Sequence, residues 1–157
     1  MSISLEISEF KLLFSSFWVL SKGLSIVSFF LSCKSIDPDS QIIDPLELQA
    51  GLLDGTWKLK DLSSAVKDGN IEESFLGLEL VIYGSTKIGG NFSTVNSSDE
   101  NVWPQKGTWT FYNEDPNKIL RDDGVLITVL VSDTILTSSF TVIGGLKEGN
   151  WEFSFVK

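Results

Sequence analysis

Few side chains in this sequence are suited to enzyme chemistry. Histidine is absent, which removes the usual near-neutral acid–base group and the commonest metal ligand. Two carboxylates, Glu79 and Glu152, fall in stretches with strand character and are candidates for the opposed acid pair of a glycoside hydrolase. Glutamates on strands are, as a rule, solvated surface residues. We therefore predict no catalytic residue, no metal site, no cofactor and no enzymatic activity.

Cys33 is the one cysteine in the sequence, and its position favours attachment rather than catalysis. It follows a short apolar run, residues 24–31, with Lys22 before the run and Ser32 immediately before the cysteine. A cation, an apolar stretch and a small residue at the cleavage point are the parts of an export signal. The arrangement resembles the lipobox of a bacterial lipoprotein. We expect residues 1–32 to be a signal peptide that is removed, and the thiol of Cys33 to carry lipid.

An uncleaved membrane-spanning helix over residues 12–32 is the alternative for this segment, because its length is enough to cross a bilayer. Lys22 lies in the middle of that span, where a lysine costs about 2.5–3.5 kcal/mol on insertion scales. The signal peptide therefore fits the residues better. Residues 33–54 then form a lipid-anchored tether, which is interrupted by Asp37-Pro38 and Asp44-Pro45.

Acidic residues outnumber basic ones, 21 to 12, which gives a formal net charge of −9 at pH 7. Such a surface repels phosphate backbones and anionic lipid headgroups, so we exclude nucleic acid as a partner. Contact with the lipid membrane must then come from the acylated Cys33. We expect a lipid-anchored protein of the bacterial cell envelope, at the outer membrane, and leave open whether it faces the periplasm or the cell surface.

Downstream of the tether, apolar and polar residues alternate in short runs that are separated by Gly, Asn and Asp clusters. This pattern predicts antiparallel strands. The predicted strands cover residues 56–61, 78–83, 88–95, 106–112, 118–121, 125–131, 135–143 and 150–156, after one short helical turn at 46–53. Asp123-Gly124, Asp133-Thr134 and Gly144-Gly145 predict three of the hairpin connections.

Side-chain alternation assigns the faces of these strands. Aromatic residues share one face of the fourth and last strands: Trp109, Phe111, Trp151, Phe153 and Phe155. The strand at 125–131 is apolar on both faces, so we expect its outer face to be covered. Eight sequential strands with one aromatic face predict an all-β, up-and-down antiparallel barrel over residues 55–157. An open β-sandwich is the alternative.

Five short stretches, taken in order, resemble one family. They are Gly55-Thr56-Trp57, Trp103-Pro104-Gln105-Lys106-Gly107-Thr108-Trp109-Thr110-Phe111, Ile119-Leu120-Arg121-Asp122-Asp123-Gly124, Ser139-Phe140-Thr141-Val142 and Gly149-Asn150-Trp151-Glu152-Phe153. The first resembles the Gly-X-Trp start of calycin barrels, the lipocalins and their relatives. The ordered set resembles the small lipocalin-like lipoprotein domains of Bacteroidetes. The resemblance covers residues 52–157 and implies an eight-stranded barrel behind a lipid anchor, in a family whose members mostly have no assigned activity.

Aromatic residues of the predicted barrel are candidates for a ligand pocket: Trp57, Trp109, Phe111, Trp151 and Phe153. The alternative is that they fill the core, because an eight-stranded barrel is just wide enough to be packed by side chains or to hold one small ligand. An internal void on the order of a few hundred Å³ favours binding of a small apolar ligand, with residues 63–75 as a loop over the mouth. A filled interior favours a structural or interaction protein that acts through its outer surface.

Arg121 is the single arginine of the chain. Calycin barrels typically close one end with an arginine over the Trp of the first strand, so the resemblance implies that Arg121 stacks on Trp57. The alternative is a local ion pair with Asp122 or Asp123. Asp133-Thr134-Ile135 resembles the acceptor sequence of Bacteroidetes O-glycosylation, in which Thr134 would carry the glycan. An ordinary hairpin turn is the alternative.

Overall fold

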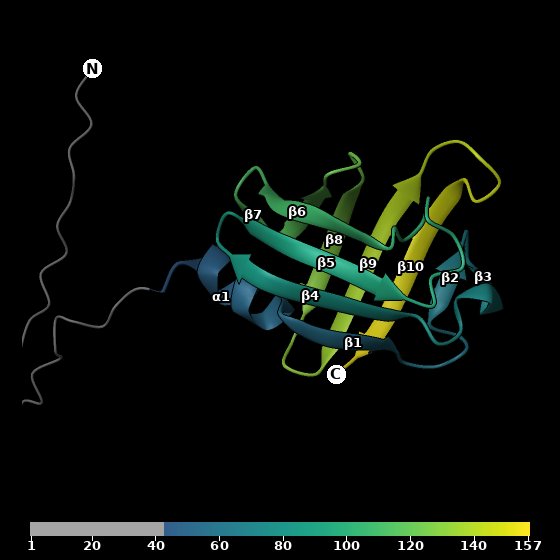
Figure 1. The fold of residues 1–157 in the computed structure, drawn as a ribbon, viewed down its shortest axis with the longest axis horizontal. Helices are drawn as coiled ribbons and strands as arrows, with labels where there is room; N and C mark the ends of the chain where they lie inside the picture. The colour runs from purple at the N-terminus through teal and green to yellow at the C-terminus, as the bar shows by residue number, and fades with distance from the viewer. Residues whose placement is uncertain (1–42) are drawn as a thin grey trace, which may run out of the picture. The chain divides into compact units, whose positions relative to one another are not determined.

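The computed structural model describes residues 43–157 (Figure 1). The predictions for the signal peptide at 1–32, for acylation of Cys33 and for the membrane-spanning alternative at 12–32 lie outside these residues. Along the described part of the chain, no helix is both long enough and apolar enough to cross a membrane.

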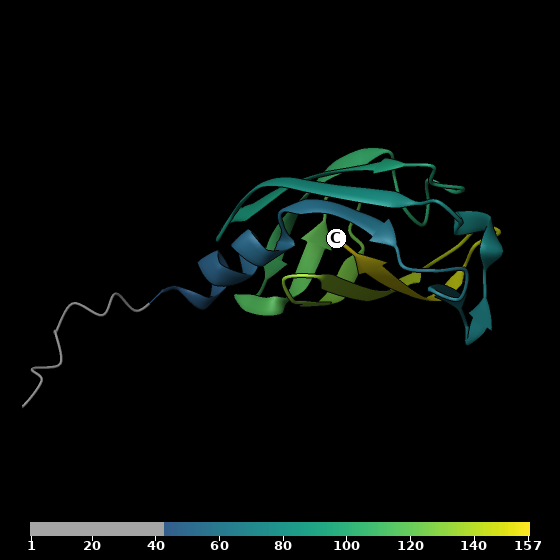
Figure 2. The same cartoon turned by 90° about the horizontal axis from the view of Figure 1, so that it is seen from below.

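Eight antiparallel strands form a closed barrel, as the alternation predicted (Figures 1 and 2). They are β1 (Gly55–Leu59), β4 (Glu79–Thr86), β5 (Gly89–Val95), β6 (Lys106–Tyr112), β7 (Asp115–Arg121), β8 (Leu126–Val131), β9 (Ile135–Val142) and β10 (Gly149–Val156). Each strand pairs with the next in this order, and β1 pairs with β10 to complete the ring. The completed ring excludes the open β-sandwich.

One edge of β10 is shared by two partners. Lys58 of β1 lies opposite Val156, and β2 (Ala65–Lys67) then takes the same edge opposite Trp151–Phe153. A short strand, β3 (Asn70–Ile71), forms a hairpin with β2 and is followed by the 3-10 turn η1 (Glu73–Phe75). The segment 63–75, expected as a loop, therefore contains regular structure because β10 has free backbone groups for it to pair with.

The turns between strands lie at the residues that predicted them. Gly124 has a φ of 88°, and Gly144 and Gly145 have φ values of 79° and 82°, a region that glycine adopts without strain. At the β6–β7 connection, Asn113 and Glu114 also take positive φ values, of 52° and 57°. This tight turn lets β7 begin earlier than the predicted start at residue 118.

The helix α1 (Pro45–Leu53) packs against one end of the barrel (Figure 2). Asp44 caps it by accepting a hydrogen bond from the Leu46 N–H at 3.0 Å, and proline at the first helical position suits the helix start. The side chains of Ala50 and Leu53 are fully buried. The range 33–54, expected as a tether, thus includes a helix that belongs to the folded domain, because its apolar residues reach the core.

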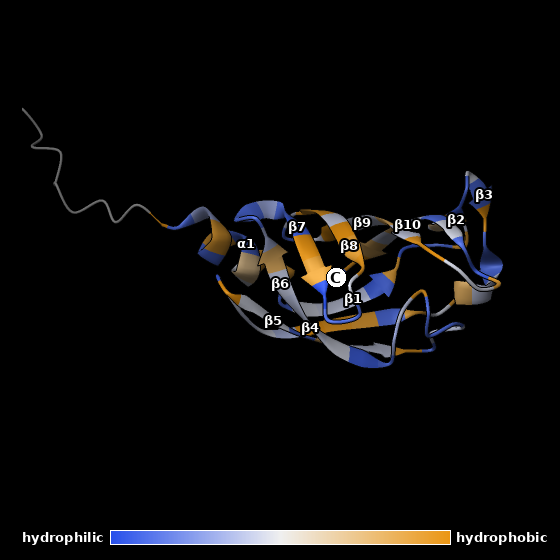
Figure 3. Cartoon of the chain, turned by 90° about the horizontal axis from the view of Figure 1, so that it is seen from above, coloured by the Kyte–Doolittle hydropathy of each residue, from blue (hydrophilic) through white to orange (hydrophobic). Residues whose placement is uncertain are grey.

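The interior face of the barrel is aromatic and aliphatic, as expected. Along β10, Trp151, Phe153 and Phe155 are buried and stack in sequence, with ring centroids 5.6 Å and 5.9 Å apart. The outer face of β8 differs from expectation, because Leu126 and Leu130 are 41% and 61% exposed. Figure 3 shows this apolar strand in orange. Within residues 43–157, no element covers these two leucines.

Candidate functional site

The interior of the barrel, the first candidate site, is filled with side chains. The void that remains has a volume of about 20 Å³. Apolar side chains from β4, β5, β7, β8 and β9 surround it, together with Trp103, Trp109, Arg121 and Ser138. A volume of this size suits one water-sized group and is far below that of a pocket for a drug-sized ligand.

Both ends of the barrel are closed. At one end lies α1, and the indole N–H of Trp57 donates a hydrogen bond to the Leu53 carbonyl oxygen at 2.8 Å. At the other end, the loop of residues 96–105 between β5 and β6 turns Trp103 into the interior. The Trp103 ring packs edge-on against Phe140, with centroids 5.3 Å apart, and it is buried.

Hydrogen bonds fix the path of the 96–105 loop. The Trp103 backbone N–H donates to the Asp99 carbonyl oxygen at 3.0 Å, and the Ser97 hydroxyl donates to the Trp103 carbonyl oxygen at 2.6 Å. The Thr94 hydroxyl also donates to the Pro104 carbonyl oxygen, at 2.8 Å. These bonds hold the backbone on both sides of the indole, so the ring enters the barrel in one defined place.

The five aromatic candidates lie inside the barrel, but they do not form one pocket. Trp57, Trp109, Trp151 and Phe153 are buried, and Phe111 is half-buried against the Trp109 ring, with centroids 5.1 Å apart. Among these five, Trp109 borders the void. The other four pack against neighbouring side chains, so their present role is that of core residues.

Arg121 closes the end that holds Trp103, and the implied stacking on Trp57 is wrong. The guanidinium carbon of Arg121 lies 5.4 Å from the Trp103 ring centroid and 5.5 Å from that of Phe140. The position over Trp57 is taken by Lys157, whose Nζ lies 4.4 Å from the ring centroid. Arg121 does not reach Trp57 because the two residues lie at opposite ends of the barrel. Arg121 is the last residue of β7, at the end away from α1, whereas Trp57 lies at the α1 end.

The alternative for Arg121, an ion pair with a neighbouring aspartate, is also present. Its Nε and Nη2 donate to the two carboxylate oxygens of Asp123 at 3.1 Å and 2.5 Å, and its Nη1 donates to the Val102 carbonyl oxygen at 2.6 Å. Burial alone raises the pKa of Asp123, but the hydrogen bonds and charge of Arg121 lower that pKa below its ordinary value. The aspartate therefore stays ionised and neutralises the buried guanidinium.

Trp103 and Lys157 help to close the two ends of the barrel, and neither was predicted from the sequence. Trp103 belongs to the motif that carried the family resemblance, but it precedes a proline in a loop, outside the strand alternation that identifies inward residues. Lys157 follows the last strand, a position at which the sequence predicts a charged residue to be solvent-exposed. Its position over Trp57 depends on the helix α1, whose Leu52 carbonyl oxygen accepts a hydrogen bond from Lys157 Nζ at 3.1 Å.

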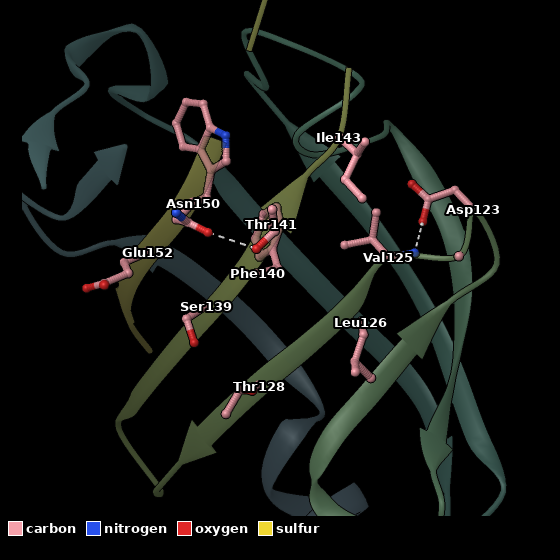
Figure 4. Close-up of a pocket in the computed structure, with 12 residues that line it drawn as sticks. Asp123, Val125, Leu126, Thr128, Ser139, Phe140, Thr141, Ile143, Asn150 and Glu152 are labelled. Carbon is pink, nitrogen blue, oxygen red and sulfur yellow. Dashed lines mark hydrogen bonds between the residues drawn. The ribbon is translucent and has the colours of Figure 1, made fainter. Parts of the chain in front are cut away.

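The second candidate site is a groove on the outer face of β8, β9 and β10 (Figure 4). Its volume is about 680 Å³. Thr128, Ser139 and Glu152 face outward in one row across the three strands. In the next row, the Thr141 hydroxyl donates to the Asn150 side-chain oxygen at 2.9 Å. The groove thus combines hydroxyls, an amide and a carboxylate next to the exposed side chain of Leu126.

The charge of the groove is negative, and Glu152 carries it. Asp123 also lines the groove, but its charge is balanced by Arg121, and none of the described residues that line the groove is a lysine or an arginine. Residues 43–157 also hold no group of three or more His, Cys, Asp and Glu side chains with the arrangement of a metal site. The groove is therefore suited to a partner with positive and apolar groups rather than to an anion.

No protein-family model matches this chain, and neither does any curated protein or solved structure with which it was compared. The barrel architecture consequently rests on the strand pairing itself.

Proposed function

We propose that this chain is a lipid-anchored interaction protein of the bacterial cell envelope, without enzymatic activity, whose lipocalin-like barrel acts through its outer surface. The observation that carries the proposal is the filled interior. The void of about 20 Å³ compares with roughly 300–1,000 Å³ for pockets that bind small molecules. A barrel whose interior is occupied by its own side chains offers its outside for recognition.

The groove on β8, β9 and β10 is the part of that outer surface best suited to a partner. It is negatively charged through Glu152, and it adjoins the exposed apolar residues Leu126 and Ile143. Charge complementarity then favours a basic, partly apolar region of another envelope protein. The overall charge of −9 acts in the same direction, because it attracts basic partners over longer distances.

The anchor rests on Cys33 and the apolar run before it. If the thiol is acylated, the fatty-acid label that living cells incorporate into the protein is lost in a Cys33→Ser variant. The variant protein is then unprocessed or soluble. Label that persists in Cys33→Ser overturns the anchor and leaves the interaction surface to be judged separately.

A photo-crosslinking experiment in living cells tests the interaction surface. The full-length protein carries a photo-reactive residue at Ser139, in the groove, or at Thr110, an exposed position on β6. We expect a discrete protein adduct from Ser139 and none from Thr110. The adduct is expected to weaken with Glu152→Lys, but not with Glu114→Lys, which makes the same charge change at the β6–β7 turn. Equal adducts from both positions, or adducts insensitive to Glu152→Lys, overturn the proposal.

Binding of a small apolar ligand inside the barrel is the second candidate. It is favoured by one observation: Trp103 comes from a loop, so movement of the 96–105 loop would enlarge the void without breaking the strand pairing. Native mass spectrometry of the full-length protein separates the two candidates. A small apolar molecule that co-purifies in stoichiometric amount favours the second candidate over the first.

A further inference from the structure

Three residues that border the same small void each carry a buried polar atom without a hydrogen-bond partner in the protein. These atoms are Nε1 of Trp103, Nε1 of Trp109 and Oγ of Ser138. The three residues are 3%, 2% and 3% exposed, respectively. Buried polar groups in native proteins are nearly always hydrogen-bonded, and those that are not require an explanation. Three of them around one void point to a shared partner.

The two remaining tryptophans of the described chain show that indole pairing is otherwise complete. Trp57 donates to the Leu53 carbonyl oxygen at 2.8 Å, and Trp151 donates to the Lys147 carbonyl oxygen at 2.9 Å. Both of these partners are backbone atoms four residues earlier in the chain. Trp103 and Trp109 have no such local acceptor, so their buried N–H groups are left without a partner in the protein.

The chemistry of the three groups defines the partner. An indole N–H is a donor only, whereas a serine hydroxyl both donates and accepts. Two obligatory donors require an acceptor between them and exclude a cation. Arg121 also borders the void, and three of its five N–H groups are engaged, two by Asp123 and one by the Val102 carbonyl oxygen.

We propose that the void of about 20 Å³ is a binding site for a single water-sized hydrogen-bond acceptor, held by Trp103, Trp109 and Ser138. A water accepts from the two indoles and donates to Ser138, which makes the three bonds typical of a buried water. A monatomic halide accepts from all three groups. The site joins the 96–105 loop to β6 and β9, so its occupant ties Trp103 to the barrel.

The indole resonances of the full-length protein, labelled with ¹⁵N at tryptophan and assigned through single Trp→Phe variants, provide the test. For water, we expect cross-peaks to a long-lived water at the N–H of Trp103 and Trp109, and none at Trp57 and Trp151. For a halide, titration with sodium bromide shifts the first two resonances saturably, whereas sodium sulfate at matched ionic strength does not.

A pair of serine variants tests the third group of the site. Ser138→Ala is expected to abolish the water cross-peaks or the halide shifts at both indoles. Ser139→Ala, a change at the neighbouring, outward-facing position of β9, is expected to leave them unchanged. The proposal is overturned if neither water nor bromide is detected at Trp103 and Trp109, or if the signals persist in Ser138→Ala.

Discussion

The α1 end of the barrel and the Trp103 end are both closed by an indole next to a cation, but the two closures differ in origin. At the α1 end, Trp57 bonds to a carbonyl oxygen of the adjoining helix, and Lys157 lies over its ring. At the other end, Trp103 lies on a loop, Arg121 lies over its ring, and its N–H has no hydrogen-bond partner in the protein. The indole N–H of the first closure has a partner four residues away in sequence, whereas both cations reach their indoles from distant parts of the chain.

The two closures also consist of different kinds of structure, a helix at one end and a loop at the other. Removing α1 from the barrel breaks the hydrogen bond between the Trp57 indole and the Leu53 carbonyl oxygen and exposes two fully buried apolar side chains. Moving the 96–105 loop likewise exposes two buried apolar side chains, Val102 and Trp103, and breaks the hydrogen bonds of that loop. Either movement leaves every barrel strand paired. Local opening starts more readily in a loop than in a helix, whose backbone is held by its own hydrogen bonds. We therefore expect any access to the interior to occur at the Trp103 end.

The largest expected effect comes from Trp103→Ala, which should lower the free energy of unfolding by about 3–5 kcal/mol because a buried indole is replaced by a cavity. Urea denaturation followed by circular dichroism measures this change. Added indole should recover part of the loss, since the cavity matches it in shape. Tyr83→Ala, which truncates an exposed aromatic residue, is the control and should change the stability by less than about 0.5 kcal/mol. A similar small change for Trp103→Ala would show that the loop does not close the barrel.

A smaller effect is expected for Arg121→Met. The Val102 carbonyl oxygen and the Asp123 carboxylate both lose their donor, which should cost about 2–3 kcal/mol of unfolding free energy. The matched control is Lys118→Met on the same strand, which removes an exposed ion pair with Asp115 and should cost less than about 1 kcal/mol. Equal losses in the two variants would contradict the role assigned to Arg121.

At the α1 end, Lys157→Met should cost about 0.5–1 kcal/mol, the usual value of a cation–π contact near the surface. Lys157→Arg keeps a cation in reach of the Trp57 ring and should lose less. Thermal unfolding of the three proteins measures the order. If both variants lose the same amount, the contact of Lys157 with Trp57 contributes nothing through its charge.

The smallest effect is a pH dependence at the Trp103 end. The pKa of Asp123 is lowered from its ordinary value of 3.8, so the ion pair contributes its full stability above that pH. The contribution is lost as the pH falls through the lower pKa of the folded protein. Because Asp123 is partly exposed, we expect no more than about 0.5 kcal/mol.

Comparison of the original protein with Asp123→Asn isolates this contribution. Asp61 and Glu72 also have lowered pKa values, but they are present in both proteins and cancel in the difference. Urea midpoints at several pH values should show a constant gap from neutral pH to about 4 and a shrinking gap below it. A gap that is unchanged at pH 2 would contradict the lowered pKa of Asp123.

The sequence was sufficient to predict the barrel because the evidence for strands is local. Alternation along β10 places Trp151, Phe153 and Phe155 on one face, and the structure buries all three. Glycines at the turns specify positive φ values in the same local way. The hairpin within residues 63–75 was missed because β2 and β3 are very short and exist by pairing with the free edge of β10.

The occupants of the interior were harder to predict, for a physical reason. Whether Arg121 reaches Trp57 or Trp103 depends on which end of the barrel each residue lies at, and alternation does not specify the end. Trp103 lies in a loop whose path is set by hydrogen bonds such as that from the Ser97 hydroxyl. The volume of the barrel interior likewise depends on how the side chains pack together. The sequence therefore left open whether the barrel is hollow or filled.

The shared edge of β10 has a consequence for the order of folding. During synthesis β1 emerges first, whereas its partner on the closing edge, β10, is the last strand to appear. Until then the outer edges of β1 and of the newest strand remain unpaired, and such edges are prone to pair with other chains. Ring closure also joins segments that are far apart in sequence, which makes folding slow. The nascent chain therefore needs protection from aggregation until β10 arrives.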